Sequence, residues 1–242
     1  AGGTPALRNQ NLSRINMHIA IDGTPAINDI RAIQRYTWNL INELSEIDSE
    51  NSYSVIYLGY KPCSSTLPPD ISNPKFNPIF SSLPGRLLNA SWSISSFPSV
   101  SFWTRRKTDV VHFPGGSAYI PASGEKFITT LHGFLSLKCP RFVAPARAKA
   151  EMKKLERTIS RSVRLITVSE TNKKGLEEMF GVKPERISAI PLGVGKEFHE
   201  FSISDEERSS FLRKYSLPAG DFLMYAGAIE PNKNINGILL AF

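Results

Sequence analysis

The feature that most constrains this chain is a regular alternation, from Met17 onward, of short β-branched runs with longer segments whose apolar residues recur at the helical period. Strands separated by helices pair in parallel, because each helix returns the chain to the starting edge of the sheet. The pattern therefore predicts an α/β fold, a parallel sheet with helices on both faces. The runs that predict strands are residues 17–22, 53–59, 109–113, 126–131, 164–168, 187–190 and 222–226.

Apolar stripes between these runs predict core-facing helices. A helix over about 171–180 is expected to end at Gly181, because glycine readily adopts the left-handed conformation past a helix end. The run at 76–80 predicts only an edge strand, because Pro78 lacks the N–H that a central strand needs. The two longest stripes are Ile33, Thr37, Leu40, Ile41, Leu44 and Ile47, and Ala148, Met152, Leu155 and Ile159.

Composition excludes several classes of protein. With 41% hydrophobic and 21% charged residues, the chain suits a soluble globular protein and not a disordered, collagen-like or coiled-coil one. Cys63 and Cys139 lack the spacing of a zinc site, so no metal and a reducing, cytoplasmic compartment are expected. The longest uncharged stretch, 87–104, holds six serines and does not suit a membrane span. A net charge of +7 favours phosphate-bearing partners or an anionic membrane surface, unless it is simply a solvated basic surface.

Turn-forming and small polar residues follow the predicted strands. In an open α/β sheet the carboxyl ends of the strands form the edge at which ligands bind. Each residue alone is explained by the needs of a tight turn; together they predict a ligand site along one edge. They are Asp22, Gly23, Gly59, Pro114, Gly115, Gly116, His132, Gly133, Ser169, Pro191, Gly193 and Gly227.

The chain divides into four segments by composition. Residues 1–16 lack any apolar period and are interpreted as a leader or a cloning remnant. Residues 17–200 form the first α/β domain. Residues 201–220 are a charged linker with one short helix, and 221–242 begin a second α/β unit that is too short to bury a core of its own.

Six segments resemble, in order and spacing, the retaining glycosyltransferases of family 4, and most closely the bacterial mannosyltransferase-like members that build cell-surface polysaccharide. The segments are IAIDGTPA, IQRYTWNLINEL, DVVHFPG, FITTLHG, RLITVSETNKKGLEEMFGVKPERISAIPLGV and FLMYAGAIEPNKNINGILLAF. The resemblance implies the GT-B architecture of two Rossmann-like domains. Residues 17–200 would be the acceptor-side domain, and 221–242 the start of the donor-binding domain.

The resemblance also implies a reaction. A sugar, with mannose as the first expectation, would move with retention from a GDP- or UDP-sugar to a saccharide or a lipid-linked acceptor. The leaving diphosphate needs cations and backbone N–H groups, so no cofactor is expected. The chain alone is expected to be inactive. It would be cytoplasmic, and attachment at the inner face of the membrane is left open.

Two residues match catalytic positions of the family. Lys233 lies in the E-P-x-K-N segment and would neutralise the donor phosphate; its usual arginine partner is Ala228 here. His132 matches the histidine of an HD-type motif, with Gly133 in place of the aspartate. The alternatives are an ordinary exposed lysine and a structural histidine, and His112 is expected to be a packed core residue.

Further residues are assigned to substrate loops by the same resemblance. The family places glycines before R-Y, where this chain has Ala32 and Gln34; either Gln34 donates a hydrogen bond to phosphate or activity is weakened or lost. Arg31 and Arg35 are candidates to compensate with charge. The expected donor phosphate loop comprises Gly23, Ala32, Gln34, Arg35 and Gly227, and the expected acceptor side comprises Gly115, Gly116 and Ser169.

Aromatic residues lie beside a basic cluster, Arg105–Lys107, in the segment 83–107. They suit a peripheral membrane contact, and burial against the sheet is the alternative. They are Trp92, Phe97, Phe102 and Trp103. No signature of a nucleic-acid-binding protein accompanies them.

Two other functions stay open at this point. One is a non-catalytic sugar- or lipid-binding module on the same fold. The other is an epimerase of sugar nucleotides, which needs acid and base groups on both faces of a cleft, whereas this half offers only His132.

Overall fold

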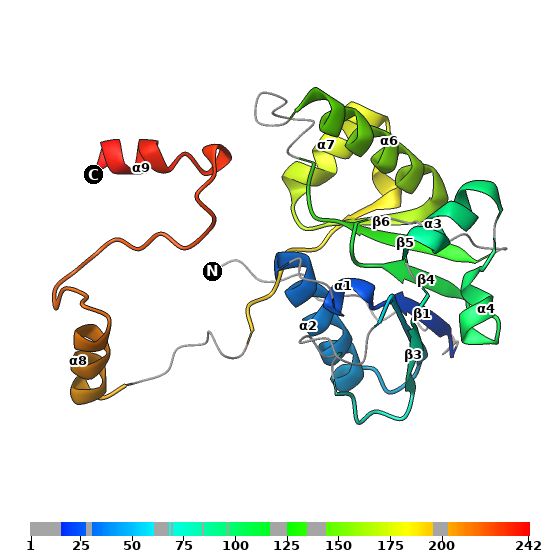
Figure 1. Ribbon diagram of the computed structural model, residues 1–242, viewed down its shortest axis with the longest axis horizontal. Helices are drawn as coiled ribbons and strands as arrows, with labels where there is room; N and C mark the ends of the chain where they lie inside the picture. The colour runs from blue at the N-terminus through cyan, green and yellow to red at the C-terminus, as the bar shows by residue number, and fades with distance from the viewer. Residues whose placement is uncertain are drawn as a thin grey trace.

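The computed structural model of the chain describes residues 16–27, 31–60, 68, 70–83, 85–95, 97–116, 125–134, 144–195 and 203–242. Within them lies one seven-stranded sheet, ordered β3-β2-β1-β4-β5-β6-β7, in which every neighbouring pair is parallel (Figure 1). The α/β, Rossmann-like prediction is confirmed. The strands are β1 (His18–Asp22), β2 (Ser52–Leu58), β3 (Phe76–Ser81), β4 (Val110–Phe113), β5 (Lys126–Leu131), β6 (Ser162–Thr167) and β7 (Ile187–Ala189).

The direction in which strands are added reverses at β1. The chain first builds outward to β3, then returns and adds β4 to β7 on the other side of β1. The gap between the carboxyl ends of β1 and β4 is therefore the switch point at which α/β sheets bind ligands. β3 pairs only with β2, so the edge position predicted from Pro78 is confirmed.

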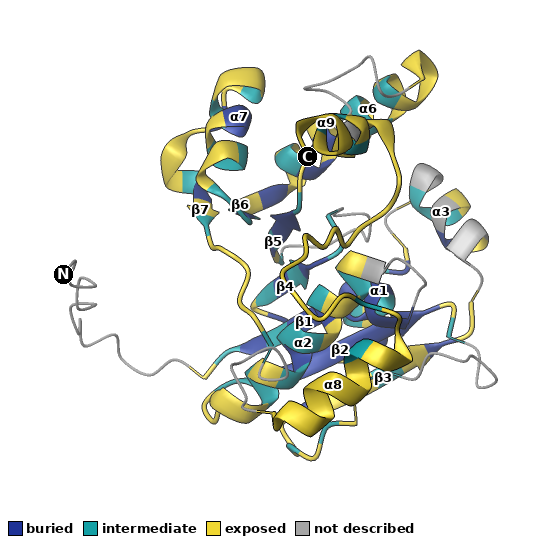
Figure 2. Ribbon diagram, turned by 90° about the vertical axis from the view of Figure 1, so that its left-hand side faces the viewer, coloured by how far each residue is buried: buried dark blue, intermediate teal, exposed yellow. Residues whose placement is uncertain are grey.

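Alternate residues of the central strands enter different cores. Ala20 packs with Val100 and Trp103, whereas its neighbour Ile21 packs with Ile41. Because successive strand residues point to opposite faces, the two clusters are the two covered faces of the sheet. The buried residues follow the strands in Figure 2. A third cluster lies under two helices, α6 (Pro145–Arg161) and α7 (Glu170–Phe180).

The two predicted stripes lie on α2 (Arg31–Ile47) and α6 (Pro145–Arg161), and the helix expected at 171–180 is α7 (Glu170–Phe180). The other helices of the described residues are α1 (Thr24–Ile27), α3 (Gly85–Ile94), α4 (Val100–Thr104), α8 (Asp205–Lys214) and α9 (Ile235–Ala241). Thr37 and Ile41 of α2 are fully buried, but Ile47, at the end of the helix, is 74% exposed and leaves the stripe. Gly181 has φ 60° and caps α7, as predicted.

The predicted strand at 222–226 is wrong. Residues 221–230 contain no strand, and Leu223 and Met224 are exposed by 77% and 80%. A β-strand is stabilised by ladder hydrogen bonds to a neighbour, and no described residue pairs with this segment. None of the described side chains of residues 203–242 is buried, and α8 and α9 lie apart from the sheet in Figure 1.

The aromatic segment divides between the two alternatives. Trp103 is 9% exposed and belongs to the core, with Trp92 packed against it. Phe97 and Phe102 touch edge to face at 5.0 Å and are exposed by 58% and 49%. Burial thus accounts for the tryptophans and not for the phenylalanines.

Several sequence predictions fall outside the described residues, among them Cys63, Cys139 and the leader up to residue 15. Among the residues that are described, no helix is long and apolar enough to cross a membrane. The same residues contain no cluster of His, Cys, Asp or Glu able to hold a metal ion.

Candidate functional site

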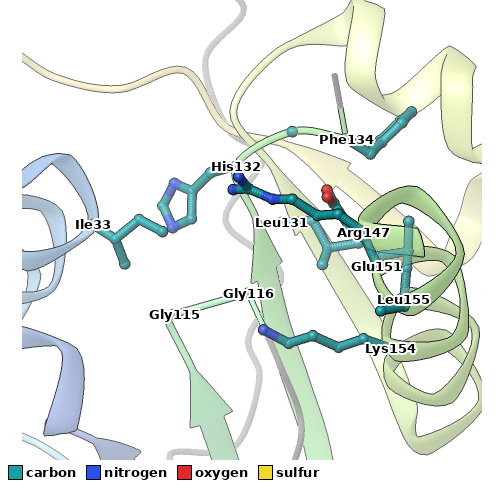
Figure 3. Close-up of a pocket in the computed structure, with 12 residues that line it drawn as sticks. Ile33, Gly115, Gly116, Leu131, His132, Phe134, Arg147, Glu151, Lys154 and Leu155 are labelled. Atoms are coloured by element: carbon teal, nitrogen blue, oxygen red, sulfur yellow. The ribbon is translucent and has the colours of Figure 1, made fainter. Parts of the chain in front are cut away.

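A cavity of about 390 Å³ opens at the carboxyl edge of the sheet, beside the switch point (Figure 3). The turn after β4 contributes Gly115 and Gly116, and residues 131–134 at the end of β5 form the opposite part of the lining. α6 covers one side, and Ile33 in the first turn of α2 closes another. The cavity therefore lies where four separate chain segments meet at the edge predicted to bind ligand.

His132 is held in this cavity in one orientation. Its Nε2 lies 2.7 Å from the carbonyl oxygen of Pro114. A carbonyl oxygen only accepts, so Nε2 carries the proton, and in the neutral ring Nδ1 is left as a hydrogen-bond acceptor. The carbonyl of His132 accepts from Nδ2 of Asn172 at 3.3 Å. Both its side chain and its backbone are thus tied to neighbouring elements.

Tyr36 of α2 supports the His132 ring. The two rings meet edge to face with centroids 4.7 Å apart and planes at 80°. The Tyr36 hydroxyl lies 3.3 Å from Oγ1 of Thr130, which in turn lies 2.9 Å from Nε2 of His112. These contacts link α2, β4 and β5 behind the catalytic candidate.

His112 is a neutral member of this network. Burial, followed by the proximity of His132, lowers the pKa of His112 to about 4. Burial also raises the pKa of Tyr36 above its usual value. The prediction that His112 is a packed strand residue agrees with its place in β4, although its side chain is only half-buried.

The two expected acceptor-side glycines line the cavity. A Cβ on Gly115 would lie 2.7 Å from Cγ of Pro25, and Gly116 has φ +83°, so a side chain is excluded at the first and strained at the second. Ser169 has a different place: its Oγ caps α7 by accepting from the N–H of Asn172 at 3.2 Å, and it does not line the cavity.

The backbone N–H groups of the turn after β1 are hydrogen-bonded within the fold. The N–H of Gly23 donates to Ile56, that of Thr24 to Oδ1 of Asp22, and that of Ala26 to Gly23, while Pro25 has none. A Cβ on Gly23 would lie 2.6 Å from the Tyr57 ring. Gly23 is thus required by packing, and its N–H is engaged within the fold.

Three further residues of the expected phosphate loop lie on the first turns of α2. Ala32 and Arg35 are exposed, and Gln34 is half-buried with its Nε2 donating to the carbonyl of Ala26 at 3.3 Å. Gln34 therefore joins α2 to α1. None of the three lines the cavity, although Ile33 between them does.

Lys233 and Gly227 lie in the exposed segment that follows α8. Lys233 belongs to a short 3-10 helix, η4 (Pro231–Lys233), and Gly227 follows the segment wrongly predicted as a strand. Neither lines the cavity that contains His132. The structure does not bring the two catalytic candidates into one site.

Sequence reasoning missed the charged residues of the cavity, Arg147, Glu151 and Lys154. Their spacing of four and three puts them on one face of α6. The periodicity of the sequence already contained this charged face, because each of the three residues directly precedes a member of the apolar stripe of the same helix. Only the packing of α6 against β6 and the end of β5 shows that this face borders a cavity.

Residues 33–198, more than half of the chain, match glycosyltransferase family 4. The chain belongs to this family. It is 26% identical over 145 residues to O-antigen chain mannosyltransferase B of Escherichia coli, a match that covers 60% of this chain and 38% of that protein. The chain therefore spans well under half the length of this curated relative. Family 4 membership implies the class of retaining glycosyltransferases.

Two solved structures share 14% sequence identity with the chain and each matches 84% of it. One is the wall teichoic acid polymerase TagF with the substitution H548A, of which 45% is covered with a TM-score of 0.42. The other is a glycosyltransferase from Rickettsia africae ESF-5, of which 50% is covered with a TM-score of 0.40.

Proposed function

We propose that this chain is the acceptor-side half of a retaining glycosyltransferase of cell-surface polysaccharide synthesis. Residues 17–200 would form the acceptor domain, 201–220 the linker, and 221–242 the start of a donor-binding domain. The donor would be a GDP- or UDP-sugar, with mannose as the first choice because the Escherichia coli relative is a mannosyltransferase. The acceptor would be a saccharide or a lipid-linked saccharide.

The observation that carries this proposal is the cavity beside the switch point, with His132 held in one tautomer. In the neutral ring, Nδ1 can accept a hydrogen bond from a hydroxyl of the transferred sugar or of the acceptor. Such a contact fixes the orientation of the reacting sugar, and positioning of this kind is a large part of catalysis by an enzyme without a cofactor.

The leaving diphosphate needs positive charge and N–H donors. The N–H of Gly23 is engaged with Ile56, so we assign this role to the first turn of α2 and to Lys233. Lys233 would reach the phosphate from the second domain when the two halves face each other.

A peripheral membrane contact belongs to the same proposal. Phe97 and Phe102 are exposed, and Arg105, Arg106 and Lys107 follow them in sequence and are exposed as well. Exposed aromatic rings beside cations suit the interface of an anionic membrane, at which a lipid-linked acceptor is held.

The test is sugar transfer by the parent protein in which the donor-binding domain is complete. His132→Ala and Lys233→Ala should each lower kcat/KM by about 10²- to 10³-fold, the usual cost of removing one group that stabilises a transition state. Lys183→Ala, at an exposed lysine far along the chain from both, is the control and should change nothing.

The product separates the rival functions. A new glycoside with retained configuration supports transfer, and an altered sugar nucleotide without a glycoside would support the epimerase. No turnover in wild type or variants, with saccharide binding intact, would support the binding module and overturn the proposal.

A further inference from the structure

The charged residues of α6 that line the cavity have no part in the transfer described above. We propose that Arg147, Glu151 and Lys154 form a specificity site for an acidic acceptor saccharide, one that carries a phosphate ester or a carboxylate. This inference rests on the proposed function, since it names the substrate class of the same cavity.

The three side chains converge on the cavity from one helix face. Figure 3 shows Arg147 extending toward His132, and Lys154 extending toward Gly115 and Gly116. Leu155, 7% exposed, anchors this part of α6 in the core formed with β5, β6 and α7. The two cations therefore project from a well-packed part of the helix to opposite ends of one cavity.

The cavity carries an excess of positive charge. Among the described residues, no ion pair joins Arg147 or Lys154 to Glu151 or to any other carboxylate. Two cations against one carboxylate leave a net charge of about +1, and a concave site concentrates such a potential more than a flat surface does.

The remaining polar groups fit a sugar. The Glu151 carboxylate and Nδ1 of His132 are acceptors, suited to sugar hydroxyls, whereas the Arg147 guanidinium can hold two oxygens of a phosphate or carboxylate at once. A neutral saccharide would satisfy the acceptors and leave the two exposed cations paired with water alone. An acidic saccharide satisfies the whole set, and a volume of about 390 Å³ lies within the range of small-ligand sites.

The experiment measures binding to the chain itself by NMR titration or calorimetry. The probes are mannose 6-phosphate, glucuronate and mannose, which differ in the anionic group. We expect the two acidic probes to bind at least tenfold more tightly than mannose. Tight binding of only one of them would restrict the site to phosphate or to carboxylate and would still support it.

A matched pair of double variants tests the residues. Arg147→Gln with Lys154→Gln should weaken binding of the acidic probes at least tenfold and leave that of mannose unchanged. Lys149→Gln with Lys153→Gln removes the same charge from exposed positions of α6 that do not line the cavity, and should change affinity less than twofold. Glu151→Gln should strengthen binding of the acidic probes, because it removes a negative charge from the site.

Two results would overturn the inference. The first is that the acidic probes bind no more tightly than mannose. The second is that both double variants lose affinity equally, which would indicate a general basic surface.

The proposed function is tested by a separate measurement. Transfer to a neutral acceptor that the cavity variants leave unchanged would keep the function and reject the acidic specificity. Absent transfer would reject the function, while the binding data still decide the specificity.

Discussion

Replacement of Gly23 by alanine should destabilise the sheet through packing. The added Cβ would lie 2.6 Å from Cε1 of Tyr57 and 2.7 Å from Cγ1 of Val55, and both of these side chains are only 1% exposed. Tyr57 is further confined by stacking on Phe80 at 5.2 Å. Forcing a methyl group into a packed core costs about 1–3 kcal/mol, and two confined neighbours favour about 2–3 kcal/mol here.

The loss is measured by thermal and urea unfolding of the chain. For a protein of this size, 1 kcal/mol lowers Tm by about 2–4 °C, so Gly23→Ala should lower it by about 4–12 °C. Gly193→Ala is the control, because nothing lies within 4 Å of its Cβ position. In a double-mutant cycle with Tyr57→Ala, the cost of Gly23→Ala should fall by about 1–2 kcal/mol, because the ring that it meets is gone.

A Gly23→Ala variant within about 0.5 kcal/mol of wild type would refute the packing argument, since this is the usual scatter of surface substitutions. If the same variant lost donor affinity in the parent protein, Gly23 would regain the role in phosphate binding that its sequence position suggests. The two readouts therefore separate a glycine required by its neighbours from one required by a ligand.

Three further predictions concern the groups around this sheet. His112→Gln should reduce the loss of stability that accompanies a fall in pH from 6.5 toward 4, because the unfolded histidine gains its proton before the native one, whose pKa is lowered to about 4. The full pKa shift corresponds to about 3 kcal/mol, and partial solvent access reduces this to about 2 kcal/mol. A urea midpoint whose pH profile is the same in the variant and in wild type would contradict this prediction. Asp48 accepts hydrogen bonds from Tyr53, from Asn51 and from the backbone of Glu50, and these outweigh the effect of burial and lower its pKa. Asp48→Asn should therefore lower the free energy of unfolding by about 1–3 kcal/mol at neutral pH. In urea unfolding, the difference between this variant and wild type should become smaller as pH falls below 3.8. Tyr36→Phe should lower the free energy of unfolding in urea by about 1 kcal/mol, because it removes the hydrogen bond to Thr130. The imidazole NMR shifts of His132 should stay the same, because the ring contact is kept. A large change in those shifts would show that the hydroxyl, and not the ring edge, holds the histidine.

Periodicity predicted the elements of the sheet because the spacing of apolar residues within a single segment shows which face of that strand or helix will be buried. It failed at residues 222–226, where the apolar and aromatic run is present but no strand of the described residues pairs with it. It also overextended the stripe of α2 to Ile47, which lies at the end of the helix and is largely exposed.

The candidate site was accessible to sequence reasoning only in part. His132, Gly115 and Gly116 follow predicted strands, so the shared edge of a parallel sheet was enough to expect them near one another, and they do line one cavity. Gly23 and Ser169 follow strands as well, but one is packed against Tyr57 and the other caps α7. The spacing of the sequence does not distinguish residues that line the cavity from residues with a structural role, because the two kinds differ only in which neighbours they contact.

The amino-acid order by itself determined most types of element, their parallel pairing and membership of glycosyltransferase family 4, since these depend on local period and on the order and spacing of several segments along the chain. Only the tertiary structure decided that α6 brings Arg147, Glu151 and Lys154 beside His132. Contacts between loops and helices that are distant in sequence depend on the order of the strands and on the packing of side chains between layers. Those are properties of the assembled fold, and no single segment of the sequence contains them.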